Sequence, residues 1–269
     1  NIRLKTSDWK DDLTAQVERY QPDLIAISST EDMWELGIKS IEHIKDYITK
    51  NNTPVIAGGV FATFAPDLCI EHPLINMVCV GEGEVAIVDL CNKIHNNEDY
   101  STVTNLWVKD EKGEIKKNKI AKLVDVDTSP ILDLDLFEES RLYRPMAGKV
   151  YRMLPIETMR GCPYTCRFCN SPSQMSMYKA EANGGFFRKK SVGQVYEELR
   201  FFKDKLNCFF FFSTHSHCAE NTRYVHSKFA HLLHRCGTSA RSHLPSPWHV
   251  VCFPWSRQFA SATELVCRR

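Results

Sequence analysis

Three short apolar runs near the start of the chain constrain its fold more than any other feature. The runs cover 23–28, 54–59 and 76–81, and each one ends in small residues. A run that is apolar on both faces is typical of a strand buried inside a parallel sheet. Between the runs, segments 9–20 and 34–48 place apolar side chains at helical spacing. This repetition of strand and helix predicts an open, doubly wound α/β sheet.

The carboxyl ends of these predicted strands are the expected place for a ligand, because ligands of open α/β sheets bind beyond that edge. Hydroxyl, glycine and acidic residues occupy the three ends: Ser28, Ser29, Thr30, Gly58, Gly59, Gly81, Glu82, Gly83 and Glu84. Glycine lets a ligand approach the backbone closely and tolerates a positive φ. From the residues alone, two other interpretations stay open. The hydroxyls can cap the following helix, and the acidic residues can complement a helix dipole.

A second region with strand and helix signals follows a hairpin and a linker. Residues 105–120 are typical of a hairpin with its turn at 110–113, and the acidic segment 124–140 is interpreted as an interdomain linker. Farther on, a predicted helix begins after a capping box at 191–194 and leads into an apolar strand at 208–212. We therefore expect four parts: a sheet domain at 1–100, the hairpin and linker at 101–150, a second domain at 151–212 and a tail at 213–269.

The tail, residues 213–269, differs in composition from the rest of the chain. It holds only two of the 33 acidic residues, Glu220 and Glu264, but seven of the ten histidines. Neither a helical nor a strand period continues there, which is atypical of a continuing α/β domain. We expect the tail to be foreign to the rest of the chain, through a frameshift, mis-splicing or a truncated read, and to be out of frame or disordered.

Composition argues against several classes of protein. A net charge of +1 gives no reason to expect nucleic acid or a membrane surface as a partner, and no apolar run approaches the ~20 residues that span a bilayer. Eleven cysteines without a secretory segment favour metal ligation in a reducing compartment, so we expect a cytoplasmic protein. Cys69, Cys79 and Cys91 lie in apolar segments and are interpreted as small buried hydrophobes. Because the sequence opens on Asn1, we expect an internal fragment.

Three cysteines, Cys162, Cys166 and Cys169, are packed into one short stretch without a fourth beside them. A structural zinc site needs four protein ligands, and ferredoxin-type motifs also supply a fourth cysteine at a regular spacing. Here the next cysteine is Cys208, beyond the predicted helix. A cluster held by three thiolates leaves one iron free for a substrate or cofactor. The alternative is a structural zinc knuckle completed by a distant Cys or His.

The stretch "ETMRGCPYTCRFCNSP", with its Cys-x-x-x-Cys-x-aromatic-Cys spacing, resembles the cluster signature of the radical S-adenosylmethionine (SAM) enzymes. The resemblance implies that Cys162, Cys166 and Cys169 hold a [4Fe-4S] cluster whose open iron binds SAM, and that Phe168 lies against the adenine. Reductive cleavage of SAM then yields a 5′-deoxyadenosyl radical, with electrons from a donor such as a flavodoxin or ferredoxin. The resemblance also implies that the start of a partial βα barrel begins near residue 151.

The first domain resembles cobalamin-binding domains, which have a flavodoxin-like sheet. In that family the hydroxyl residues meet the nucleotide tail of cobalamin, the glycines let that tail approach, and Gly-Glu-Gly-Glu often follows, as in "VCVGEGEVAIVDL". The resemblance assigns cobalamin contacts to Ser28, Ser29, Thr30, Gly58, Gly59, Gly81 and Glu82. Over residues 1–212 the chain therefore resembles cobalamin-binding radical SAM proteins.

The sequence departs from this family at both ends. The family's sheet begins with a strand and helix upstream of Asn1, so we expect a central strand and any Asp-x-His-x-x-Gly motif for cobalt to be missing. His43, His72 and His95 do not lie in such a motif and are interpreted as surface or helix-end residues. The sequence identifies no catalytic side chain, and no further SAM or substrate contact can be placed after residue 212.

The resemblance implies an enzyme that methylates an unactivated carbon of a small-molecule or peptide substrate, with SAM cleavage and methylcobalamin supplying the chemistry. The same cofactors also serve oxidative cyclisation and other radical rearrangements. Two further alternatives are a non-catalytic module that binds cobalamin and zinc, and an inactive truncated product.

Overall fold

The computed structural model describes residues 7–137, 139–146, 148–182, 185–206, 210–213, 249–252 and 265–266. The chain divides into two compact units, and each is described by itself. The sheet unit is built mainly from Lys5–Val124, and the cysteine unit from Asp125–Ser176 and Gly185–Ser256.

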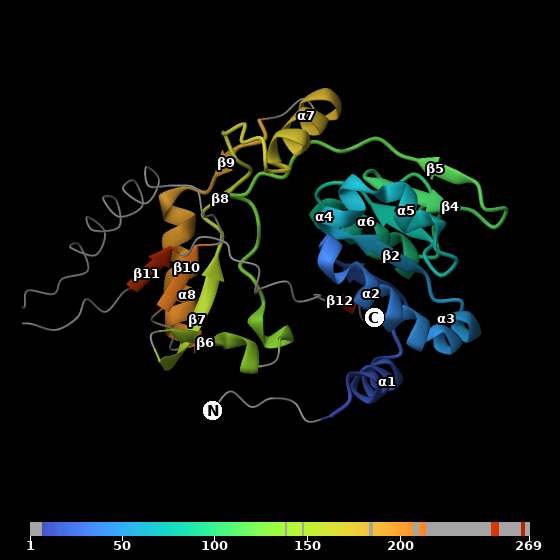
Figure 1. The fold of residues 1–269 in the computed structure, drawn as a ribbon, viewed down its shortest axis with the longest axis horizontal. Helices are drawn as coiled ribbons and strands as arrows, with labels where there is room; N and C mark the ends of the chain where they lie inside the picture. Colours follow the sequence, from blue (N-terminus) through green and yellow to red (C-terminus); the bar gives the residue numbers. More distant parts are fainter. Residues whose placement is uncertain are drawn as a thin grey trace, which may run out of the picture. The chain divides into compact units, whose positions relative to one another are not determined.

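The sheet unit contains a six-stranded sheet in the order β12-β1-β2-β3-β4-β5 (Figure 1). Its strands are β1 Ile25–Ser28, β2 Val55–Gly58, β3 Met77–Cys79, β4 Leu106–Lys109, β5 Ile115–Lys117 and β12 Leu265–Val266. The first three strands pair in parallel, which confirms the predicted parallel core. The predicted hairpin is also confirmed, because β4 and β5 are antiparallel and Gly113 N–H donates to Asp110 O in the turn. The strand β12 pairs antiparallel with β1 at the sheet edge.

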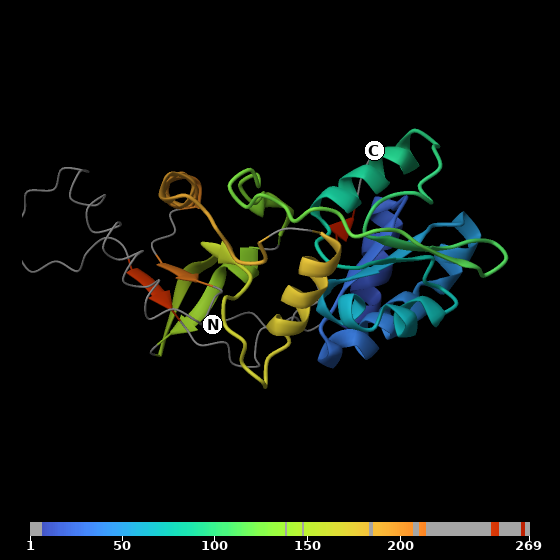
Figure 2. The ribbon, with the colours of Figure 1, turned by 90° about the horizontal axis from the view of Figure 1, so that it is seen from above.

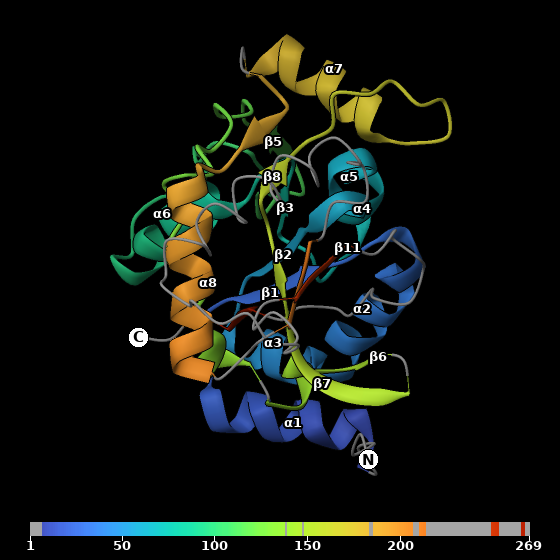
Figure 3. The ribbon, with the colours of Figure 1, turned by 90° about the vertical axis from the view of Figure 1, so that its left-hand side faces the viewer.

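Helices cover both faces of this sheet. They are α1 Trp9–Tyr20, α2 Glu31–His43, α3 Lys45–Asn51, α4 Gly59–Phe64, α5 Pro66–Glu71 and α6 Glu84–His95. The helix α6 lies on one face, and α2, α4 and α5 lie on the other, as Figures 2 and 3 show. Leu90 of α6 packs with Met77 of β3 and Leu106 of β4, and all three side chains are fully buried. The unit is therefore a doubly wound α/β sheet, as the sequence predicts.

The apolar period over 34–48 forms two helices rather than one. The chain leaves the helical conformation at Ile44, whose φ and ψ are −100° and 17°. Ile41, Ile44 and Ile48 are all buried, so the apolar stripe continues across the break. Periodicity alone therefore could not reveal where α2 ends.

The cysteine unit contains a four-stranded sheet in the order β11-β10-β7-β6, and a two-stranded ladder. Its elements are η1 Leu134–Leu136, η2 Glu139–Leu142, β6 Tyr143–Met146, β7 Lys149–Ile156, β8 Met159–Arg160, β9 Arg188–Lys189, α8 Val192–Leu206, β10 Phe210–Ser213 and β11 His249–Cys252. The helix α7 Ser171–Glu181 also begins in this unit, to which its residues 171–176 belong. The parallel pairing of β7 with β10, which α8 precedes in the chain, confirms the start of a second strand–helix series. In Figure 1, α8 runs beside these strands.

The core of the cysteine unit joins the sheet to α8 and to the segment before it. Leu154 and Ile156 of β7 pack with Leu199 of α8. Leu134 joins them, so the segment interpreted as a linker contributes a buried side chain. Burial of such side chains stabilises the fold by about 1.5–3 kcal/mol each.

Within the tail, the structure describes Ser213 at the end of β10 and the strands β11 and β12. The expected foreign or disordered character of the other tail residues lies outside the described residues, as does Cys208. Every helix in the described parts of the chain is too short or too polar to cross a bilayer.

Candidate functional site

Three loops at the carboxyl ends of β1, β2 and β3 form the first candidate region, called here the strand-end loops. They comprise residues 28–30, 58–59 and 81–84. The first two are joined by backbone hydrogen bonds, since Ser29 N–H donates to Gly58 O over 3.3 Å and Phe61 N–H donates to Ser29 O over 3.2 Å. A Cβ at Gly59, whose φ is +88°, would lie 2.8 Å from Ser28 Oγ. Only glycine fits this close crossing of the two loops.

The second and third loops are joined through Thr63 of α4. Its hydroxyl donates to Gly59 O over 2.9 Å and accepts Gly81 N–H over 3.1 Å. Gly81 has a φ of +92°, a conformation that favours glycine. Gly58, by contrast, has an extended φ of −142°, so the conformational freedom expected of the glycine pair is used at Gly59 alone. One buried hydroxyl thus connects the ends of two strands.

The third loop is tied to the hairpin and to the end of the sheet unit. Asn105 is buried, and its Nδ2 donates to Glu82 O over 2.7 Å. The carboxylate of Glu82 accepts Val124 N–H over 2.9 Å. In this structure Glu82 therefore anchors its own loop, while Glu84 begins α6.

Two hydroxyls in the first loop are buried without hydrogen-bond partners among the described residues. These atoms are Ser29 Oγ and Thr30 Oγ1. Thr30 precedes α2 at the N-cap position, yet its side chain does not cap the helix. A buried hydroxyl without a partner costs about 1–3 kcal/mol, so such atoms in native proteins call for an explanation. A polar ligand at this edge would satisfy both.

The second candidate region is the cysteine loop, residues 161–170, between β8 and α7. Gly161 begins it with a φ of +81°, and a Cβ there would overlap the carbonyl oxygen of Phe186. The adjacent ladder pairs Arg160 with Arg188, so the loop starts at a fixed point on a paired strand. Two hydrogen bonds of 2.9 Å from Arg160 to the Glu157 carboxylate add to this base.

The base of the cysteine loop also rests on a buried ion pair. Lys190 N–H donates to Thr158 O over 3.0 Å. Its Nζ lies 2.5 Å from Glu198 Oε1 of α8, with both side chains at most 7% exposed. The ion pair thus links Lys190, which directly follows β9, to α8.

The loop's last cysteine lies at the start of α7. Ser171 N–H donates to Cys169 Sγ over 3.4 Å, and Cys169 N–H donates to Cys166 O over 3.2 Å. Hydrogen bonds from Ser171 lower the pKa of the Cys169 thiol below its usual value. A thiolate is the form that binds metal, and a helix amino end favours it.

The other loop residues differ in exposure. Cys162 is buried and Cys166 half-buried, whereas Phe168 is 89% exposed. Among the described residues, no three His, Cys, Asp or Glu side chains lie close enough to hold a single metal ion. A cubane cluster binds each thiolate through a different iron, so it needs a wider spacing of the three thiols.

The buried cysteines of the sheet unit have the opposite environment. Burial raises the pKa values of Cys69 and Cys79 to about 12, with Glu84 adding to the effect at Cys79. Both are buried as expected, while Cys91 is half-buried. These thiols pack as apolar groups.

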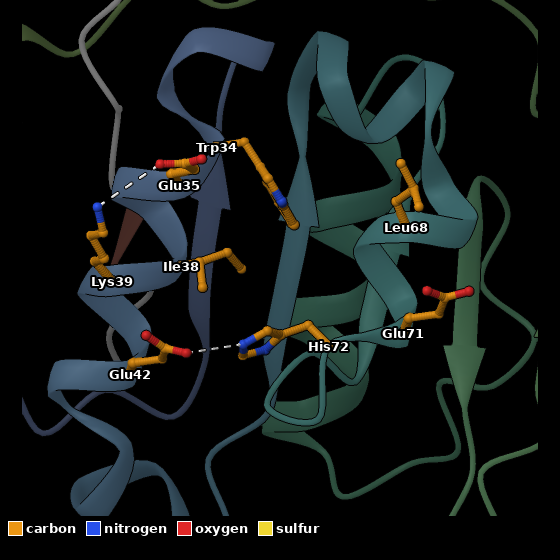
Figure 4. Close-up of a pocket in the computed structure, with 8 residues that line it drawn as sticks. All are labelled: Trp34, Glu35, Ile38, Lys39, Glu42, Leu68, Glu71 and His72. Carbon is orange, nitrogen blue, oxygen red and sulfur yellow. Dashed lines mark ion pairs between the residues drawn. The ribbon is translucent and has the colours of Figure 1, made fainter.

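The three histidines of the sheet unit lie away from the strand-end loops. His43 ends α2 and shares a 3.0 Å hydrogen bond with Thr14, and His95 ends α6. His72 follows α5 and lines a pocket of about 470 Å³ between α2 and α5 (Figure 4). Its Nε2 lies 3.6 Å from Glu42 Oε1. The expectation of surface or helix-end histidines is met, and none of the predicted cofactor residues lines this pocket.

The sequence reasoning missed Thr63 and Asn105, and did not single out Gly161. Thr63 is four residues after Gly59, a spacing that lets a hydroxyl bond back to its own helix. Asn105 has a φ of +67°, which asparagine tolerates better than most residues. Neither feature of the sequence reveals the distant hydrogen-bond partner, which is Gly81 for Thr63 and Glu82 for Asn105.

Comparison with known proteins gives a family for the first part of the chain. Residues 1–91 match the family described as B12 binding domain. The chain is 29% identical over 193 residues to an uncharacterized methyltransferase of Pyrococcus horikoshii, which covers 70% of this chain and 38% of that protein. It is 27% identical over 155 residues to TokK of Streptomyces tokunonensis, a cobalamin-dependent radical SAM methyltransferase, covering 56% of this chain and 22% of TokK.

A solved structure has the same fold. The cobalamin-dependent SAM radical enzyme OxsB, with aqua-cobalamin and SAM bound, gives a TM-score of 0.58 at 23% identity. This match covers 76% of the chain and 27% of OxsB, so the chain spans well under half the length of these relatives. Each of the two sequence alignments is longer than the B12 binding segment itself. The family match and the two relatives together make this chain similar to the cobalamin-binding radical SAM superfamily.

Proposed function

We propose that this chain provides the cobalamin-binding and cluster-binding parts of an enzyme that methylates an unactivated carbon. The observation that carries the proposal is the thiol of Cys169, which lies in a three-cysteine loop and receives the Ser171 N–H at the start of α7. This hydrogen bond favours the thiolate, the form needed for an iron–sulfur cluster. Cys162 and Cys166 complete the ligand set, and Phe168 offers an exposed ring for the adenine of SAM.

The strand-end loops support the second cofactor. Ser29 Oγ and Thr30 Oγ1 are buried without partners among the described residues, and they lie at the edge where α/β sheets bind ligands. Ser28, Gly58, Gly59 and Gly81 surround the same edge. The hydroxyl groups suit the nucleotide tail of cobalamin, which is polar, while the space beside Gly59 and Gly81 is taken by Ser28, Ser29 and Tyr178. Glu82 holds its own loop in place and does not contact cobalamin in this proposal, because its carboxylate already accepts the Val124 N–H.

When bound, the cluster with SAM supplies a radical that abstracts hydrogen, and cobalamin supplies the methyl group. The chain's own residues bind and orient these groups. Cys162, Cys166 and Cys169 would hold the cluster through three thiolates, and the iron without a thiolate would be open to SAM. An electron donor such as a flavodoxin or ferredoxin and a small-molecule or peptide substrate complete the proposal. We place methylation first because two of the relatives named above are methyltransferases, and cyclisation stays the alternative because anaerobic magnesium-protoporphyrin IX monomethyl ester cyclases also match the chain.

The test uses the full chain, reconstituted anaerobically with iron and sulfide. We expect a brown protein that contains iron and sulfide in equal amounts. Alanine variants of Cys162, Cys166 and Cys169 should each lose the cluster, whereas Cys91→Ala, a half-buried cysteine of the sheet unit, should keep it. A colourless protein with stoichiometric zinc would contradict the cluster and favour the zinc-binding module.

The cobalamin half of the proposal has its own test. Hydroxocobalamin should bind the same chain, and Ser29→Val, which replaces an unpartnered hydroxyl by apolar atoms, should weaken the binding by about tenfold. Thr128→Val, an exposed hydroxyl of the cysteine unit, is the control and should leave the affinity unchanged. Equal affinities for the wild type and Ser29→Val would remove the assigned role of Ser29.

A further inference from the structure

The hydroxyl of Thr63 directly joins two backbone segments that follow different strands. Gly59 and Gly81 both have positive φ values, and glycine has the largest conformational freedom of any residue. Thr63 Oγ1 donates to the carbonyl of one and accepts the N–H of the other, over 2.9 and 3.1 Å. A hydroxyl has a single proton to donate, and here that proton and an oxygen lone pair are both used between the two loops.

The hydroxyl of Thr63 has no proton left for a ligand, because it donates to Gly59 O and also accepts Gly81 N–H. Its effect on a ligand must therefore act through Gly59 and Gly81. Holding both segments in one arrangement before binding reduces the entropy that binding would otherwise cost.

We infer that Thr63 is a positioning residue, whose hydroxyl sets the separation of the Gly59 and Gly81 loops for the nucleotide tail of cobalamin. This inference rests on the proposed binding of cobalamin to the strand-end loops. It predicts that loss of the hydroxyl weakens the recognition of the tail more than the recognition of the corrin ring.

The experiment compares hydroxocobalamin with cobinamide, a corrinoid that lacks the nucleotide tail, on the full chain. The quantity measured is the ratio of the two dissociation constants within each variant. This ratio does not depend on the folded fraction, because both ligands sample the same preparation. A merely structural role of Thr63 would thus leave the ratio unchanged.

Thr63→Val keeps the side chain's shape and removes its hydroxyl. We expect hydroxocobalamin to bind about tenfold more weakly to this variant, while cobinamide binding stays within about twofold. Thr63→Ser keeps the hydroxyl and should retain the wild-type ratio. If the valine variant does not fold, Thr63→Ala takes its place, and the same ratio decides.

Thr53→Val is the matched control. Thr53 is 6% exposed, so it is buried like Thr63, but it precedes β2 at the opposite end of the strand. Its substitution should lower stability without changing the ratio. An unchanged ratio in Thr63→Val, with a wild type that binds hydroxocobalamin, would overturn the role of Thr63 alone. A wild type that binds neither corrinoid would overturn the proposed function and this inference together.

Discussion

The strand-end loops are joined to one another by side-chain and backbone hydrogen bonds, whereas the cysteine loop is fixed at Gly161 and again at Cys169. Between these two points, Tyr164 and Phe168 are 47% and 89% exposed. The difference matches what each region is proposed to bind. A fold can shape a site for an organic cofactor in advance, while metal–thiolate bonds themselves organise a loop around a cluster. We therefore expect the two regions to respond differently to substitution.

The largest effect is expected at the buried ion pair beneath the cysteine loop. Glu198→Gln would leave the Lys190 ammonium buried without its counter-charge and should cost about 3 kcal/mol. Hydrogen exchange followed by mass spectrometry can locate the loss, because it reports the opening free energy of each segment. Protection should fall in α8 and β9 and stay unchanged in β1 to β3.

Glu197→Gln is the control for this substitution. The ion pair of Glu197 with Arg200 spans 3.8 Å, with side chains more than half exposed, so its loss should cost at most about 0.5 kcal/mol. An equal loss of protection in both variants, or a loss that spreads to β1 to β3, would break the distinction between the two regions.

A methyl group at the start of the cysteine loop should have the next largest effect. In Gly161→Ala the new Cβ meets the Phe186 carbonyl, and the positive φ is unfavourable as well, so we expect a cost of about 3 kcal/mol. Gly113→Ala has nearly the same φ, +82°, but no atom within 4 Å of its new Cβ, and should cost only about 1 kcal/mol.

Cluster loading and urea unfolding of the two glycine variants check this prediction. Gly161→Ala should lose iron as well as stability, while Gly113→Ala should keep its iron. Normal iron loading of Gly161→Ala would show that the loop does not depend on this anchor.

In the strand-end loops, Asn105→Ala removes the side chain that holds the third loop, residues 81–84. It leaves Glu82 O and Ala121 N–H without their partner, so we expect a loss of about 2 kcal/mol. Hydrogen exchange should show the loss in residues 81–84 and 119–124. Asn92→Ala, at an exposed position of α6, should change stability by less than about 0.5 kcal/mol. The same exchange pattern in both variants would contradict the role given to Asn105.

The smallest effect is expected from a change of pH, which should distinguish the thiol reactivity of the cysteines in the two regions. In the metal-free chain, the lowered pKa of Cys169 keeps its thiolate populated as the pH falls, until the pH passes through that lowered value. Cys79, with a pKa of about 12, stays protonated at neutral pH. Iodoacetamide should therefore label Cys169 at neutral pH and leave Cys79 unlabelled until the chain unfolds. Equal labelling rates would contradict these environments.

Local patterns predicted most of the secondary structure that supports the candidate sites. The apolar runs at 23–28, 54–59 and 76–81 correspond to β1, β2 and β3, because a strand buried on both faces needs apolar residues throughout. The spacing of Cys162, Cys166 and Cys169 was likewise visible, since one short loop carries all three. In each case the signal and the structure lie within the same few residues.

Contacts between distant residues could not be predicted in this way. The bond from Gly81 N–H to Thr63 joins residues 18 positions apart and leaves no periodic pattern. The predicted capping box is only half formed for the same reason. Gln194 N–H donates to Ser191 Oγ, but Ser191 N–H donates to Asp127, which lies 64 positions away and replaces the expected glutamine side chain.

The central claim is that three thiolates hold a cluster and leave one iron open. Electron paramagnetic resonance of the reconstituted, reduced full chain, recorded with and without SAM, tests it most directly. We predict the signal of a reduced cubane cluster whose shape changes when SAM is added, because SAM coordinates the open iron. A cluster signal that SAM leaves unaltered, or a chain that takes up zinc and gives no signal, would contradict the account.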